Sequence, residues 1–444
     1  MNSNLNYSLK FLFLFGTSLI IRCQNSIQKD NISGDTLILK DVIQQVVAKY
    51  PTILEANEAL NIADAKINLA KNSYYPNVNL TASYTRLGPT AVFDIPNLGK
   101  FQLYPENNYL INLNYYQNIY DFGKTSSHVE YEKENKKLIE ESIEQVKQKL
   151  SMRAISTYYS LIYLQEAIVI KMQQIHTLEE HRDFIKKKME TGSATELELL
   201  TTQVKLSGIE TQELDIETAW KTHLTVLNSL LGLPERTVNY VKSNWDFPNE
   251  LPSEDSLIAE ALINRNEMKI AGEKEKLSQI KLEVARKDYL PEFHAFASGG
   301  GKNGYIPELD KIKANYMAGI GLSVPIYEAS RTKNTIKLAQ SSIQDAGYES
   351  EIVQRDITGE VIEYYLKEAA AKEKVDHSKL QVQQAQKAFD LAELSYKSGV
   401  ITNVELLDNN TSLSESNLML LNAKVEYILS MYGLKMAVGE ILYR

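Results

Sequence analysis

Glu405 and Asp408 are the residues of this chain whose type and spacing have the clearest potential for chemistry. They are three positions apart, so on a helix both carboxylates lie on one face, one turn apart. Paired carboxylates attract cations and are ligands that divalent ions accept. A second interpretation stays open, because acidic residues in the first turn of a helix also stabilise its positive end by about 0.3–1 kcal/mol.

The rest of the sequence gives no signal for catalysis or for a cofactor. It contains no His–Glu metal motif, no nucleophile elbow and no nucleotide fingerprint. The glycine-rich run at 299–304 resembles a phosphate loop, but Lys302 is followed by Asn303 and not by Ser or Thr, which favours a hairpin loop. His176 and His181 are five positions apart and fall on different helix faces, so we expect both to be solvated. We predict no cofactor and no enzymatic activity.

The element that must position these acids belongs to the second half of a long internal duplication. Ile119-Tyr120-Asp121 recurs as Ile326-Tyr327-Glu328, and Gly192 recurs as Gly399. The separation is 207 positions in both cases (326 minus 119, and 399 minus 192). A solenoid unit has only ~20–50 residues, so the chain consists of two copies of one large unit with pseudo-symmetry.

Each copy has the same order of expected elements: helix, strand, loop, strand, very long helix, glycine turn and second helix. Alternating apolar and polar residues, as from Asn77 to Tyr84, predict two strands of about ten residues in each copy. After Gly123, no proline or glycine occurs from 124 to 189, which indicates a helix of about 100 Å at ~1.5 Å per residue. Gly192 and Gly399 mark the turns at the hairpin tips.

We predict four regions: a signal peptide at 1–23, a first repeat at 35–233, a linker at 234–255 and a second repeat at 256–440. In the first repeat we expect strands at about 77–87 and 108–118, a long helix at 122–190 and a hairpin helix at 194–231. In the second we expect strands at about 292–300 and 315–325, a long helix at 329–397 and a hairpin helix at 401–438.

The N-terminus resembles an export signal. Lys10 is followed by an apolar run to Ile21 that is too short to span a bilayer, which needs ~20 apolar residues. Cys23 is the only cysteine, so the exported chain has no disulfide and no thiolate metal site. Lipidation of Cys23 and ordinary cleavage nearby both stay open, because Arg22 fits a lipoprotein box poorly. The net charge of −9 argues against nucleic acid as a partner.

The expected strands have the length that crosses an outer membrane, ~9–11 residues. Four strands cannot close a barrel, and an open sheet edge cannot lie in lipid because its backbone groups would be unpaired. If the strands cross lipid, several chains must therefore share one barrel. Their long hairpins would then continue that barrel as a helical cylinder, which is the shape of a conduit.

This layout resembles the TolC family of outer membrane efflux and secretion channels over almost the whole mature chain, from about Asp35 to Gly439. The resemblance rests on the duplicated order of elements and on three motifs: Tyr75-Pro76-Asn77, Ile119-Tyr120-Asp121-Phe122-Gly123, and the run from Tyr396 through Gly399 to Asp408. It implies a mainly helical homotrimer with a twelve-stranded outer membrane β-barrel and an α-helical periplasmic tunnel. It also implies docking with a periplasmic adaptor (membrane fusion) protein and an inner-membrane RND or ABC transporter.

The resemblance also assigns roles at the hairpin tips. It implies that Glu405 and Asp408 form a ring of acids, a possible cation site, at a periplasmic gate. It further implies a hydrogen bond from the Tyr396 hydroxyl to Glu198. Two positions depart from the family pattern: Ile401 replaces an arginine and Leu197 replaces a threonine. We therefore expect a gate that is weaker or differently built.

Three functions compete. The first is a passive duct for export of small molecules or proteins, and the second is a non-conducting, envelope-spanning coiled-coil structural protein. The four alternating strands favour the duct, because a coiled-coil scaffold needs none. The third, an enzyme, lacks a candidate site. Efflux and protein secretion are not separable from this chain, since the inner-membrane pump chooses the cargo.

Overall fold

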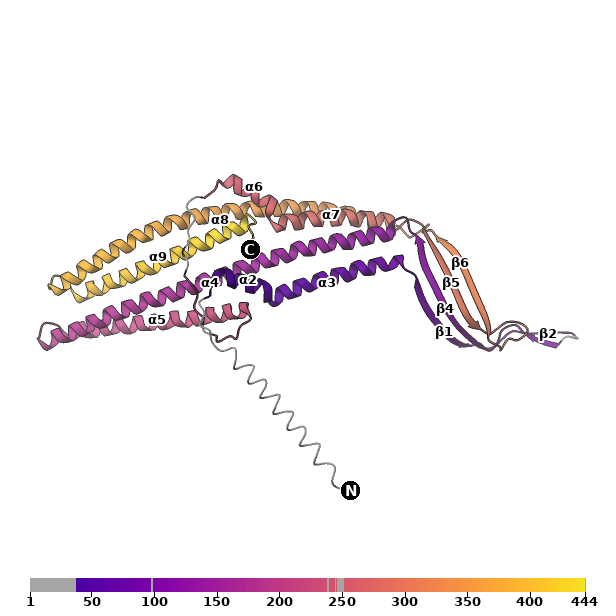
Figure 1. Ribbon diagram of the computed structural model, residues 1–444, viewed down its shortest axis with the longest axis horizontal. Helices are drawn as coiled ribbons and strands as arrows, with labels where there is room; N and C mark the ends of the chain where they lie inside the picture. The colour runs from indigo at the N-terminus through magenta and orange to yellow at the C-terminus, as the bar shows by residue number, and fades with distance from the viewer. Residues whose placement is uncertain (1–36, 97–98, 238, 244, 246–250, 444) are drawn as a thin grey trace, which may run out of the picture.

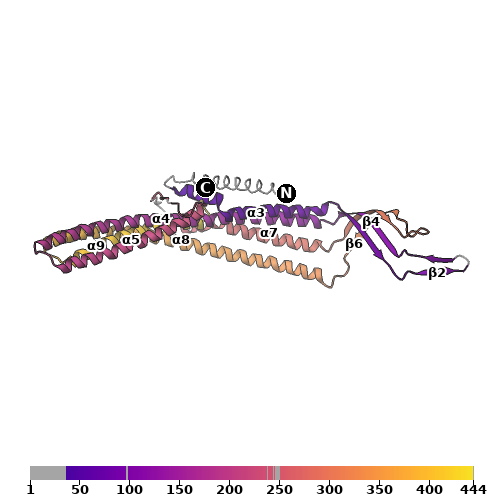
Figure 2. The same ribbon diagram turned by 90° about the horizontal axis from the view of Figure 1, so that it is seen from below.

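The structure, a computed structural model, describes residues 37–96, 99–237, 239–243, 245 and 251–443. The expected signal peptide and Cys23 lie outside the described residues, as does part of the expected linker. The molecule is elongated, with a β-sheet at one end, helical hairpins at the other and shorter helices between them (Figures 1 and 2).

The main sheet has four antiparallel strands in the order β1-β4-β5-β6. The strands are β1 (Asn77–Arg86), β4 (Asn107–Tyr120), β5 (Glu292–Lys302) and β6 (Lys313–Ser323). The central pair, β4 and β5, joins the two repeats, and β1 and β6 are edge strands. Between β1 and β4, where we expected only a loop, the chain forms a second hairpin of β2 (Val92–Ile95) and β3 (Gly99–Gln102).

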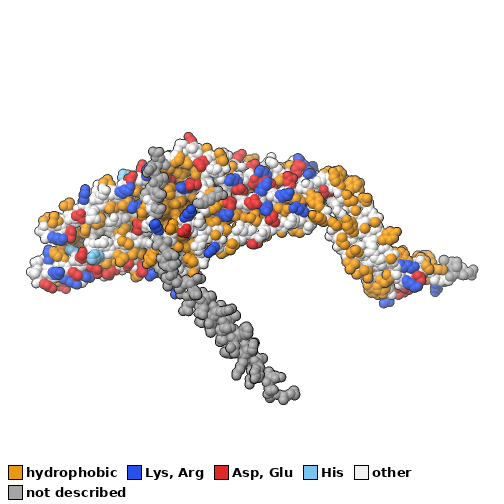
Figure 3. Space-filling view, in the orientation of Figure 1, with side chains coloured by type: hydrophobic (Ala, Val, Ile, Leu, Met, Phe, Trp, Pro, Cys, Tyr) orange, Lys and Arg blue, Asp and Glu red, His pale blue; other side chains and the backbone are white. Residues whose placement is uncertain are grey.

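The register of the sheet separates its residues into a polar and an apolar face. The polar face, as we use the term below, carries Asn77, Asn79, Thr81, Asn112, Asn114, Tyr116, Asn118, His294, Phe296, Ser298, Gly319 and Gly321. The register also places Gly300, Asn315 and Met317 on this side. On it, Asn114 Nδ2 donates to Asn79 Oδ1 and Thr81 Oγ1, both at 2.9 Å. The apolar face is open to its surroundings, with Leu80 69% and Ile320 75% exposed. Hydrophobic side chains cover this end of the molecule, whereas charged ones are spread over the helices (Figure 3).

Two helices of 67 residues each follow the strand pairs: α4 (Lys124–Glu190) and α8 (Arg331–Lys397). Each turns back at its tip into a shorter helix, α5 (Glu196–Leu231) or α9 (Asn403–Ala437). The sheet-side halves of α4 and α8 are accompanied by the remaining helices. These are α2 (Leu39–Lys49), α3 (Pro51–Lys71), the 3₁₀ turn η1 (Asn72–Tyr74), α6 (Glu254–Asn264) and α7 (Asn266–Lys287). None of the helices in the described ranges is both long and apolar enough to cross a membrane.

Side-chain hydrogen bonds at the corner between β4 and α4 start the long helix in a fixed direction. Asp121 accepts hydrogen bonds from the backbone N–H of Gly123 at 3.0 Å and of Thr125 at 2.8 Å. Gly123 itself has a φ of +85°, a conformation that glycine adopts without steric cost. The repeated Ile-Tyr-acid motif therefore marks the place where the chain leaves the sheet.

The largest hydrophobic core lies at the middle of the helical body, where α2, α4, α5 and α9 meet. Tyr158 is its largest fully buried side chain, and its hydroxyl donates to the carbonyl oxygens of Leu37 and Lys242 at 3.0 and 2.8 Å. These bonds tie the first repeat to the inter-repeat segment. Near the tips, the described residues form two small clusters of four and three buried apolar side chains.

One glycine in the interior of α8 and one in the interior of α9 test the packing of these two helices. A methyl group on Gly433 would lie 2.1 Å from Cε1 of Tyr364, whereas one on Gly347 would meet nothing within 4 Å. We predict that Gly347→Ala raises the free energy of unfolding by up to about 1 kcal/mol through helix propensity. Gly433→Ala should lower it by about 1–3 kcal/mol through overpacking. Thermal melting followed by circular dichroism measures both, and equal shifts of the same sign would contradict the close α8–α9 contact.

Candidate functional site: the hairpin tips

Both tips are built from a left-handed glycine followed by a capped helix. Gly192 has a φ of +72° and Gly399 a φ of +75°, so each completes its turn without the strain that a side chain would add. Beyond the turns, Thr195 and Thr402 are the N-cap residues of α5 and α9, and each accepts a hydrogen bond from the N–H three positions on. The two tips are therefore local copies of one motif.

Glu405 belongs to the cap of its own helix. Its Oε2 accepts from the backbone N–H of Thr402 at 2.7 Å and from the Thr402 hydroxyl at 2.9 Å, which completes a capping box. These hydrogen bonds lower the pKa of Glu405. Glu405 and Asp408 are both exposed. Within the described part of the chain, no group of three or more His, Cys, Asp or Glu residues could hold a metal ion.

The expected hydrogen bond between the two hairpins is present. The Tyr396 hydroxyl on α8 donates to Glu198 Oε2 on α5 at 3.0 Å. Tyr396 is 6% exposed, and both its burial and the bond to Glu198 raise the pKa of its hydroxyl. The bond therefore joins a buried, neutral donor to a carboxylate, which is stronger than a bond between two neutral groups.

His181 is a second link between the hairpins, and our expectation that it is solvated was wrong. Its Nε2 lies 2.7 Å from Asn403 Oδ1, and its ring meets that of Tyr396 edge-on at a centroid distance of 5.0 Å. The sequence holds the signal that we missed. His181 lies between Leu178 and Ile185 at steps of three and four, which places it on the packing face of α4.

Asn403 connects this link to the first one. Its Nδ2 donates to the Glu198 carbonyl oxygen at 3.2 Å and to Thr202 Oγ1 at 3.1 Å. Asn403, His181, Tyr396 and Glu198 thus form a continuous polar network across α4, α5, α8 and α9, which we call the tip network. Sequence reasoning found Tyr396 and Glu198 but not the other two members.

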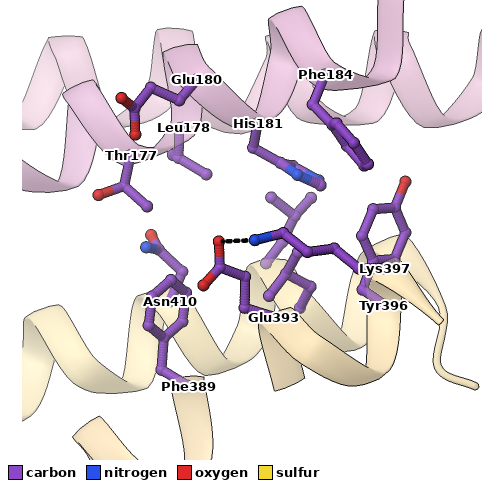
Figure 4. Close-up of a pocket in the computed structure, with 12 residues that line it drawn as sticks. Thr177, Leu178, Glu180, His181, Phe184, Phe389, Glu393, Tyr396, Lys397 and Asn410 are labelled. Atoms are coloured by element: carbon purple, nitrogen blue, oxygen red, sulfur yellow. Dashed lines mark hydrogen bonds and ion pairs between the residues drawn. The ribbon is translucent and has the colours of Figure 1, made fainter. Parts of the chain in front are cut away.

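Of the two residues that we expected to depart from the family pattern, only Ile401 joins the apolar part of the tip. Ile401 packs against the cluster of Ala392, Tyr396 and Leu406, whereas Leu197 is 74% exposed. Next to this cluster, a pocket of about 230 Å³ lies between α4 on one side and α8 and α9 on the other (Figure 4). Its rim carries the ion pair of Lys397 with Glu393 at 2.7 Å. The two hairpins are therefore held by a few contacts with free space beside them.

The titration of His181 depends on groups from all four helices of the tip. Burial is the largest influence and lowers its pKa below the ordinary value of 6.5. The hydrogen bond from His181 Nε2 to Asn403 Oδ1 and the charges of Glu198 and Glu393 oppose that shift, and Lys188 adds to it. His181 is therefore neutral at pH 7, and its protonation is unfavourable while the tip is closed.

Comparison with known proteins identifies the family to which the chain belongs. The family model described as outer membrane efflux protein matches residues 42–233 and 257–440. The chain belongs to the outer membrane efflux protein family. The resemblance to TolC is thereby confirmed, and the family is one of transport channels and not of enzymes. The protein is accordingly an outer membrane protein of the TolC type.

Individual relatives are distant in sequence and close in fold. The chain is 20% identical to the outer membrane protein TolC of Vibrio cholerae, over 97% of this chain and 96% of that protein. It is 22% identical to the alkaline protease secretion protein AprF of Pseudomonas aeruginosa, over 68% of this chain and 64% of that protein. The crystal structure of VceC from Vibrio cholerae superimposes with a TM-score of 0.74 at 16% identity, covering 90% of this chain and 96% of that one.

Removal of the Tyr396 hydroxyl tests the tip network. We predict that Tyr396→Phe lowers the free energy of local opening at the start of α9 by about 1.5–3 kcal/mol, the range for a hydrogen bond to a charged group. Amide hydrogen exchange of the first turns of α9 measures this quantity. Tyr348→Phe is the control, because Tyr348 lies on the same helix and is 65% exposed. Equal exchange in both variants would contradict the network.

Acidification tests His181. Its folded-state pKa is lowered, so the open tip binds the proton more readily, and the tip loses stability as the pH falls below about 6.5. We predict faster α9 exchange at pH 5.5 than at pH 7.5 after correction for the intrinsic rate, and loss of this difference in His181→Gln. His176 is exposed, so His176→Gln is the control and should keep the difference in exchange between the two pH values. Glu405 is outside this window, because its pKa lies below 4.5.

Proposed function

We propose that the protein is the outer membrane channel of a tripartite efflux or type I secretion system, a passive conduit for small molecules or proteins. The observation that carries the proposal is the open four-stranded sheet with an exposed apolar face. Edge strands β1 and β6 leave their backbone groups unpaired on the outer side, and such groups cannot lie in lipid. Pairing of β1 of one copy with β6 of the next removes both edges.

Three copies joined in this way form a barrel of twelve strands. The apolar face, with Leu80, Ile320 and Leu322 exposed, then meets lipid, and the polar face lines the lumen. The long hairpins of the three copies continue the barrel as a periplasmic tunnel. This arrangement is a homotrimer, which the family resemblance implies, whereas the strand count alone implies only that several copies share the barrel.

The hairpin tips are the proposed periplasmic gate. The tip network of Asn403, His181, Tyr396 and Glu198 holds the hairpins of one chain together, and the exposed Glu405 and Asp408 of three copies place six carboxylates around the mouth. Such a ring attracts cations and resists anions. In this proposal Glu405 both caps its helix and contributes to the ring, since a carboxylate has lone pairs to spare.

The proposed partners are a periplasmic adaptor and an inner-membrane RND or ABC transporter. Relatives differ in the cargo that their names state: AprF is a secretion protein and BepC of Brucella suis an efflux protein. The alternative, a non-conducting scaffold, is not favoured, because a scaffold does not need a sheet with an exposed apolar face.

Single-channel recording in planar bilayers tests the conduit and its gate together. We predict discrete, cation-preferring conductance for the mature protein. The double variant Glu405→Ala with Asp408→Ala should conduct more and prefer cations less, because repulsive and cation-binding charges leave the mouth. Asp345→Ala with Glu351→Ala is the control, since it removes two exposed acids of α8 far from the tip. A folded trimer without conductance in every variant would refute the conduit, and equal effects of both pairs would refute the gate.

A further inference from the structure

Two aromatic rings on the polar face of the sheet lie directly opposite glycines. His294 on β5 pairs with Gly321 on β6, and Phe296 pairs with Gly319. Residues that face each other across two antiparallel strands project to the same side. A methyl group on Gly321 would lie 2.3 Å from His294 Nε2, and one on Gly319 would lie 2.6 Å from Phe296 Cζ. The two rings therefore occupy the space of the missing side chains and lie across β6.

A third ring extends this arrangement onto β4. Tyr116 stacks on His294 with centroids 5.2 Å apart and an interplanar angle of 29°, and His294 meets Phe296 at 6.1 Å and 39°. We call Tyr116, His294 and Phe296 the ring layer. Because all three strands are hydrogen-bonded neighbours, the layer covers one level of the sheet near its helical end.

The glycines are confined to one face of this part of β6. On the opposite face the same strand carries Ile320 and Leu322, which are 75% and 55% exposed. If β6 needed glycine only to be flexible or thin, glycines could occur on either face. Their restriction to the polar face indicates that space is needed on that face. The small residues are thus matched to the rings that cover them.

Charge is absent from the sheet at the level of the ring layer. In the four strands of the main sheet, all of which the structure describes, Asp, Glu, Lys and Arg occur only at the ends: Glu292 at the helical end and Arg86, Lys302 and Lys313 at the outer end. A wall of this kind discriminates solutes at that level by size and not by charge.

We propose that Gly319 and Gly321 set the width of the passage through the outer membrane, by allowing the rings of Phe296 and His294 to lie flat on its wall. The inference rests on the proposed function, since it takes the polar face as the wall of a lumen. A side chain at either glycine displaces the ring beside it. The neighbouring strand blocks movement within the sheet, so the ring turns into the lumen, once in each copy of the chain.

The size of molecules that pass the ring layer can be measured with a thiol reporter. Ser73 is exposed and lines a cavity that Tyr116 and Asn118 also line, so Ser73→Cys places a thiol on the helical side of the ring layer. Maleimide-polyethylene glycols of increasing size, added to intact cells, must pass the layer to reach it. The chain without Ser73→Cys measures the background, because Cys23 is its only native cysteine.

The variants are Gly319→Val and Gly321→Val, with the smaller Gly319→Ala in case valine prevents insertion. The control is Ala318→Val, which enlarges the next residue of the same strand on the apolar face. With the largest reagent that labels the parent, we expect the rate of thiol labelling to fall about tenfold or more in the glycine variants. The reason is that a displaced ring can move only into the lumen. The smallest reagent should react as in the parent, and Phe296→Ala should restore entry when combined with Gly319→Val.

Two other outcomes would contradict two different claims, the role of the glycines and the conduit itself. If the glycine variants and Ala318→Val admit reagents of the same size, the two glycines do not set the width and the inference is wrong. If no polyethylene glycol reagent labels the parent reporter while a small thiol reagent does, the sheet does not enclose a wide passage, and the proposed conduit itself is refuted.

Discussion

The backbone hydrogen bonds that a single chain leaves unmade constrain this structure more than any contact that it makes. Each edge of the sheet, β1 and β6, offers a row of N–H and C=O groups without partners on one side. In water such edges invite aggregation, and in lipid each unpaired group costs several kcal/mol. The apolar face makes water unfavourable as well. In the proposed barrel, pairing with further copies of the chain satisfies the edges, and lipid covers the apolar face.

In the helical half, stability depends on how buried contacts are distributed along the body. Apolar burial is concentrated at the middle of the body, around Tyr158, where it fixes the hairpins relative to each other. Towards the tips the buried apolar clusters between the hairpins are small, and the network of His181, Asn403, Tyr396 and Glu198 lies there beside a pocket. Local stability follows the density of buried contacts. The tips can therefore separate while the middle stays packed, as a gate at the end of a rigid tunnel requires.

The sequence was most informative about the internal duplication and about the long, regular helices and strands. The repeat at a separation of 207 positions, the alternation in the strands and the absence of glycine from α4 can all be read from the sequence, and they predicted the strand pairs and the long hairpins. The bond between Tyr396 and Glu198 came from the family resemblance and not from physical reasoning. His181 was misjudged because its spacing from His176 was considered instead of its spacing from Leu178 and Ile185.

Other features depend on contacts that no local pattern reveals. The hairpin of β2 and β3 has strands of only four residues, too short for alternation to distinguish them from a loop. The match of Gly319 with Phe296 and of Gly321 with His294 requires the register between β5 and β6, and side-chain packing fixes that register. Glycine in a strand signals a close approach, but the sequence does not say of what.

Cross-linking of the sheet edges tests the central claim, closure between copies, most directly. Cysteines are placed in pairs, one on the apolar face of β1 (Val78, Leu80 or Ala82) and one on that of β6 (Ala318, Ile320 or Leu322), and the protein is oxidised in its membrane. A disulfide needs Cα atoms within about 7 Å, which the two strands of one chain do not offer, because β4 and β5 lie between them. The account predicts that at least one pair gives reducible covalent trimers while each single-cysteine variant does not. Monomers alone from every pair, in protein that is folded and inserted, would contradict it.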